Sequence, residues 1–111
     1  MIKATDILDF ADLKEGTVEV PEWKTTLTIR ELGLDQGLSL YSMVQSLSGN
    51  QVVMKGQDIA QVIAWSVVNP ETGKRVFSDA DVPALAKKNR NALMRIYTAI
   101  TSLTGEDAEK N

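Results

Sequence analysis

The sequence TVEVPEWKTTLTIR, residues 17–30, decides the fold of this chain. Apolar and polar residues alternate on both sides of Pro21, and β-branched residues are frequent in both runs, which is typical of strands with one face on a core. We expect an antiparallel hairpin over about residues 17–31, with Val18, Val20, Leu27 and Ile29 facing inward. A two-stranded ribbon is marginal alone, so the hairpin must pack on helices formed elsewhere in the chain.

Helical spacing of apolar residues dominates the rest of the sequence. A face of Leu40, Met43, Val44 and Leu47 predicts a helix that starts near Asp35 and stops at residues 48–50. A second helix begins at Asp58, continues through Val67, and is apolar nearly all round, so we expect it at the centre of the core. Before the hairpin, Thr5-Asp6 precedes Ile7, Leu8 and Phe10 in a segment long enough for one or two helical turns.

Two more helices are predicted after the turn at residues 69–73. A short one opens at Ser78 to Asp81, where a serine with an acid three residues later resembles a capping box. The last one follows a polar break at residues 87–89, carries one stripe of Leu93, Ile96, Tyr97, Ile100 and Leu103, and ends at Thr104-Gly105. We therefore expect a predominantly helical α+β domain over residues 1–105, with the hairpin on about four helices, and a mobile polar tail at residues 106–111.

Composition excludes most catalytic centres. The 111 residues include no cysteine and no histidine, so thiolate metal sites, disulfides and serine–histidine triads are excluded. The longest apolar runs are far short of the roughly 20 residues of a membrane span, and we expect a soluble protein of the reducing cytoplasm. The net charge of −3 disfavours nucleic acid as a partner. We predict a protein-binding function with no catalytic, cofactor-binding or metal-ligating residues and no small-molecule substrate.

Charged clusters have ordinary structural explanations. Asp79 and Asp81 with Asp6, Asp9 and Asp12 are candidates for paired catalytic carboxylates or a divalent cation site, but the preference of helix N-termini for acidic side chains is sufficient to explain them. The basic cluster of Lys87, Lys88 and Arg90 with Arg95 is interpreted as a solvated helix junction, although it leaves an acidic protein partner open.

Aromatic residues and methionines are the candidates for a partner-binding surface, because these residue types are enriched in interfaces. The candidates are Trp65, Met94, Tyr97 and Trp23, with core packing as the alternative for each, and Met43 and Met54 as further methionines. Met94 is the preferred one, since at 100° per residue it lies well off the apolar stripe of the last helix. We expect it to reach solvent or a partner.

Two blocks of the sequence resemble the tail assembly chaperones of long-tailed (lambda/HK97-like) bacteriophages and their prophage relatives. The first is VEVPEW, residues 18–23, leading into LTIREL, residues 27–32. The second runs from Ile63 through ETGKRVF, residues 71–77, and SDADV, residues 78–82, to the helix that ends at Leu103-Thr104-Gly105. The blocks cover most of the chain in the order that the family has.

The resemblance implies a mostly helical, self-associating protein that is made during virion assembly and is absent from the finished particle. Its implied role is to keep the tape measure protein and tail tube subunits soluble in the host cytoplasm until they polymerise. Many phages also make a longer form by ribosomal frameshifting. The alternative is a small helical DNA-binding regulator with residues 89–97 as its recognition helix, against which the acidic charge weighs.

Overall fold

The hairpin is present in the computed structural model, which describes residues 1–9, 12–45 and 55–109. Strand β1 (Glu15–Val20) pairs antiparallel with β2 (Thr25–Arg30), and Val18 lies opposite Leu27. Val18, Val20 and Ile29 are buried and Leu27 packs against them, which confirms the predicted inward face. The turn is a 3₁₀ helix, η1 (Pro21–Trp23), closed by Lys24 in the left-handed conformation at φ 53°.

A third strand was not predicted. The central helix α3 (Gly56–Ser66) ends before Val67, and β3 (Val67–Val68) pairs antiparallel with β2. The expectation that the helix continues through Val67 is therefore wrong. Both valines are buried, and the Val67 carbonyl accepts the Val76 N–H at 3.1 Å, so this short segment satisfies its polar groups in the sheet rather than in a helical turn.

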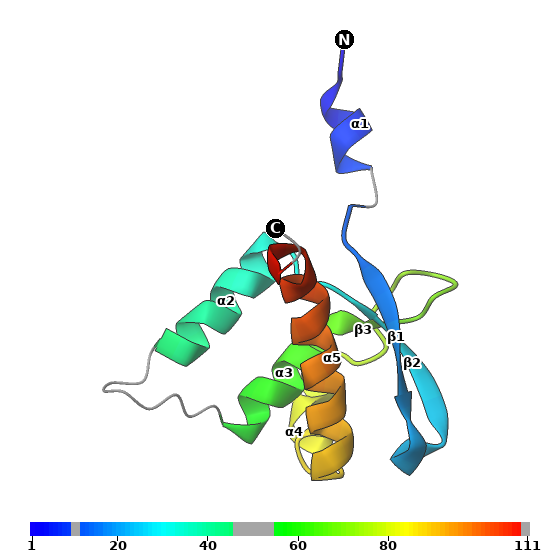
Figure 1. Cartoon of the computed structure of the whole chain (residues 1–111), viewed down its shortest axis with the longest axis vertical. Coiled ribbons are helices and arrows are strands. Elements are labelled where there is room, and N and C mark those ends of the chain that lie inside the picture. The colour runs from blue at the N-terminus through cyan, green and yellow to red at the C-terminus, as the bar shows by residue number, and fades with distance from the viewer. Residues whose placement is uncertain (10–11, 46–54, 110–111) are drawn as a thin grey trace.

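Helices α3 and α5 (Arg90–Glu109) lie side by side and form the centre of the molecule with one face of the sheet (Figure 1). The core takes Val62 and Ile63 from α3 and Ile96 and Ile100 from α5, all at most 1% exposed. This placement confirms the predicted central position of the nearly all-apolar helix. The α+β class with a hairpin on helices is likewise confirmed.

Of the other described helices, α2 (Leu34–Gln45) and α4 (Val82–Leu85) pack around this centre and α1 (Ala4–Leu8) does not. Helix α2 packs on α3, and α4 follows a 3₁₀ turn, η2 (Asp79–Asp81). Helix α1 stands apart beyond the start of β1 and buries none of its residues (Figure 1). Within the described residues, no helix is both long and apolar enough to cross a membrane.

Helix boundaries differ from the prediction at several points. Helix α5 continues through Gly105 to Glu109, so the predicted end at residues 104–105 is wrong. A helical glycine costs only about 1 kcal/mol relative to alanine, which does not end a helix whose earlier turns are held by the core. Helix α3 begins two residues before Asp58. The Asp58 carboxylate caps it from the third helical position by accepting the Lys55 N–H at 3.3 Å. Phe10, Leu47, Met54 and the predicted stop at 48–50 lie outside the described residues.

Candidate protein-binding surfaces

The four candidate side chains lie in different environments. Met94 is 39% exposed, which confirms that it reaches solvent. Trp23, Trp65 and Tyr97 are half-buried and pack against the core. Met94 and Tyr97 are three residues apart on α5 and so share one side of that helix, whereas Trp23 comes from η1 and Trp65 from the last turn of α3. Burial raises the pKa of the Tyr97 phenol, so this side chain stays neutral at ordinary pH.

Met94 lines a hollow of about 380 Å³ where α3, α4 and α5 meet. The lining residues are Gly56, Ile59, Ala86, Lys88, Arg90, Leu93 and Met94. The turn between α4 and α5 builds this hollow: Asn89 Oδ1 accepts the Ala92 N–H at 3.0 Å and so caps the start of α5. The polar break predicted at residues 87–89 is therefore a helix cap that places Lys88 and Arg90 beside an apolar floor.

The basic cluster divides into two parts. Lys87, Lys88 and Arg90 are exposed, and none of them forms an ion pair within the part of the chain that the structure describes. Arg95 instead pairs with Glu22 of η1 and ties α5 to the hairpin turn. The hydrogen bond from Arg95 is the main reason why the pKa of Glu22 is lowered. Arg95 thus has a structural role and does not extend the cluster.

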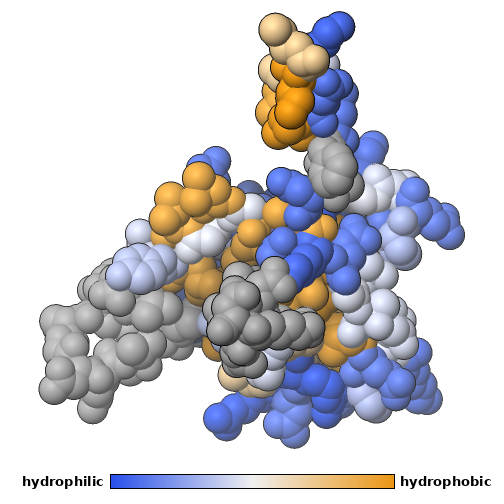
Figure 2. Space-filling view, turned by 45° about the horizontal axis from the view of Figure 1, so that its top comes forward, coloured by the Kyte–Doolittle hydropathy of each residue, from blue (hydrophilic) through white to orange (hydrophobic). Residues whose placement is uncertain are grey.

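A stripe of exposed apolar residues on α2 was missed by the sequence analysis. Leu34, Leu38 and Tyr41 are 79%, 57% and 63% exposed, and their spacing of four and three residues places them on one side of the helix. Leu40 lies off this side and packs against the core. Figure 2 shows apolar surface gathered over α2 and over α1, where Ile7 and Leu8 are also exposed. The signal was present in the sequence as a second helical stripe beside the predicted one.

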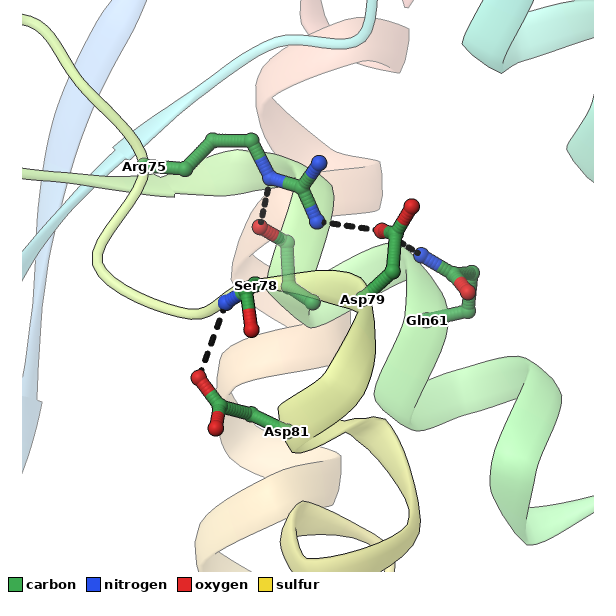
Figure 3. Close-up of polar contacts among 6 residues, drawn as sticks. Gln61, Arg75, Ser78, Asp79 and Asp81 are labelled. Atoms are coloured by element: carbon green, nitrogen blue, oxygen red, sulfur yellow. Dashed lines mark hydrogen bonds and ion pairs between the residues drawn. The ribbon is translucent and has the colours of Figure 1, made fainter.

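The carboxylates of Asp79 and Asp81 accept hydrogen bonds that stabilise the segment between β3 and α4 (Figure 3). Arg75 donates from Nε to the Ala64 carbonyl at 2.9 Å and from Nη2 to Asp79 at 2.7 Å, and Gln61 donates to Asp79 at 3.2 Å. These contacts satisfy a carbonyl in the last turn of α3 and lower the pKa of Asp79, mainly through the hydrogen bond from Arg75. Asp81 accepts the Ser78 N–H at 2.9 Å as a helix cap, as predicted.

The segment of the alternative recognition helix, residues 89–97, is not a protruding element. Ala92, Leu93 and Ile96 are buried, and α5 packs on both α3 and β1. A recognition helix presents side chains to base edges. Arg95 of α5 is instead paired with Glu22 of η1. The burial of Ala92, Leu93 and Ile96 and the pairing of Arg95 with Glu22 therefore do not favour DNA binding over protein binding.

Comparison with known proteins agrees with the sequence resemblance at the level of the fold. No protein-family model and no curated protein sequence matches the chain. Among solved structures, the bacteriophage HK97 tail assembly chaperone superposes with a TM-score of 0.65 at 16% identity. The match covers 91% of this chain and 99% of that one. The chain therefore has the fold of a tail assembly chaperone, as the resemblance implied.

Proposed function

We propose that this protein is a non-catalytic phage tail assembly chaperone that binds the tape measure protein and tail tube subunits. It acts in the bacterial host cytoplasm, keeps both clients soluble until the tail polymerises, and is absent from the mature virion. The observation that carries the proposal is the fold shared with the HK97 tail assembly chaperone over 91% of the chain. The sequence blocks at residues 18–32 and 63–105 support it independently.

The exposed apolar side chains suit a chaperone that holds and then releases its client. Met94 and the stripe of Leu34, Leu38 and Tyr41 are exposed on separate elements, α5 and α2. Dispersed apolar contacts of this kind support modest, reversible binding, whereas a large dry interface is typical of permanent complexes. Release is required when the tube subunits replace the chaperone.

Self-association is part of the proposed function. Helix α1 buries none of its residues, and an isolated helix of five residues is not stable in water by itself. The exposed side chains of α1 and α2 together offer apolar surface that a second copy can cover.

Co-expression with the tape measure protein of the same phage or prophage tests the main proposal. We expect the tape measure protein to shift from the insoluble to the soluble fraction and to co-purify with the chain. An unrelated acidic protein of similar size serves as the control. If the tape measure protein stays insoluble with both, the proposed function is wrong.

Sedimentation velocity tests self-association. The variant Leu34→Ser/Leu38→Ser should shift the distribution towards the monomer, because it removes apolar surface without touching the core. The matched control is Ser39→Ala/Ser42→Ala, which changes two exposed positions of the same helix. An unchanged distribution for the leucine variant would exclude the α2 stripe as the contact surface.

A further inference from the structure

We infer that the hollow around Met94 binds an apolar side chain of the client that is flanked by carboxylates. This inference rests on the proposed function and names the chemistry of the client segment. Two features that were interpreted separately in the sequence, Met94 and the basic residues Lys88 and Arg90, line this one hollow together. Their combination is the basis of the inference.

The floor of the hollow is apolar. Ile59, Leu93, Met94 and Ala86 provide it, and Leu93 is only 7% exposed, so the floor continues directly into the core. A volume of about 380 Å³ is at the small end of the range of about 300–1,000 Å³ that is typical of ligand sites. The hollow therefore accommodates a few side chains of a bound segment rather than a whole helix.

The rim of the hollow is cationic. Lys88 and Arg90 line it on either side of Asn89, and no carboxylate is among the described residues that line it. The nearest acid in sequence to the α3 part of the rim, Asp58, caps the start of α3 through the Lys55 N–H and is not among the described residues that line the hollow. The first turn of the 20-residue helix α5 adds a positive dipole end at the same place.

Charge complementarity therefore defines the occupant. The chain as a whole carries a net charge of −3, so it has no general attraction to acidic segments, whereas this locally basic rim favours them. Charges at the rim of an interface act mainly on specificity and association rate, while the apolar floor provides contact area. A client helix with one apolar anchor and carboxylates one turn away matches both requirements.

A neighbouring hollow of about 360 Å³ shares Lys88 but has a different rim. Val76, Phe77, Ala84 and Leu85 line it together with Asp81, whose carboxylate repels an acidic segment. Of these two hollows, the Met94 hollow is therefore the better fit for the inferred client.

Tiled peptides that span the tape measure and tail tube proteins of the same phage provide the probe. We expect the retained peptides to contain apolar residues flanked by Asp or Glu. The variants Met94→Asp and Lys88→Glu/Arg90→Glu should each bind these peptides at least about tenfold more weakly than the wild type does. Met94→Asp puts a carboxylate on the apolar floor, and the double variant reverses the charge of the rim. The control Lys24→Glu/Lys74→Glu changes two exposed residues that do not line the hollow by the same total charge and should bind as the wild type does.

A charge swap completes the test. Replacing the carboxylates of a retained peptide by lysine should weaken its binding to the wild type and restore its binding to Lys88→Glu/Arg90→Glu. Full binding by both hollow variants, while the wild type solubilises the tape measure protein, would overturn this inference and leave the proposed function standing. If the wild type neither solubilises nor binds any client, both fall. Retention of duplex DNA that the double charge reversal abolishes would also overturn it, since the cluster would then be a nucleic-acid site.

Discussion

Truncation of Ile96 tests whether α5 is the packed centre of the fold. Ile96 is 0% exposed and is surrounded by α3 and the sheet, on which α5 packs. Ile96→Ala leaves a cavity that these elements can fill only in part, and such truncations cost about 2–5 kcal/mol. We expect a value of about 3 kcal/mol or more, because core neighbours enclose the site on every side.

The expected loss is large relative to the whole stability. A domain of this size has a free energy of unfolding of about 5–15 kcal/mol, so Ile96→Ala removes a substantial part of it. Urea unfolding followed by circular dichroism should show a lower midpoint with an unchanged slope. Thr98→Ala, an exposed position on the same helix, is the matched control and should change stability by less than about 0.5 kcal/mol. If Ile96→Ala costs less than about 1 kcal/mol, the packing of α5 described above is wrong.

Three further perturbations test the local architecture. Arg75→Ala should lower the free energy of unfolding by about 1–2 kcal/mol, because it leaves a carbonyl in the last turn of α3 without its donor, and an unchanged urea midpoint would contradict this role. Glu22 has a lowered pKa because Arg95 donates a hydrogen bond to it, so the stability that it contributes is present above its ordinary value of 4.5 and is lost as the pH falls through the lowered pKa. Across this acidic range, the urea midpoint should fall less steeply with decreasing pH for Glu22→Gln than for the wild type. An equal slope would contradict the stabilising role of the Glu22–Arg95 pair. Gly73→Ala should destabilise the protein by about 1 kcal/mol because φ is +74° there, whereas Gly37→Ala, inside α2 with open space around it, should stabilise it by a similar amount. Effects of the same sign at both glycines in thermal melts would be inconsistent with these backbone conformations.

Local sequence patterns were sufficient for the main elements and for part of the site. The alternation on both sides of Pro21 predicted the strands, their turn and their inward face. The angular offset of Met94 from the stripe of the last helix predicted its exposure. Both inferences depend only on the period of an element, and this period is a property of the backbone geometry of neighbouring residues.

Other features depended on neighbours that are remote in sequence. Strand β3 has two residues, too few for a periodic signal, and exists because β2 offers it a pairing edge. The apolar stripe of α2 was missed because Leu40 and this stripe lie on different sides of one helix, and only packing against α3 decides which side is covered.

The sequence by itself determined the class of elements, the buried face of the hairpin, the central position of the helix at residues 56–66 and the absence of histidine and cysteine chemistry. These properties follow from composition and from local periodicity. Only the tertiary structure decided that Arg95 belongs to an ion pair with Glu22, 73 residues away, and that Lys88 and Met94 line one hollow with Ile59 of α3. The physical reason is that a long side chain is directed by the groups that the fold brings within its reach, and residue spacing along one helix does not contain that information.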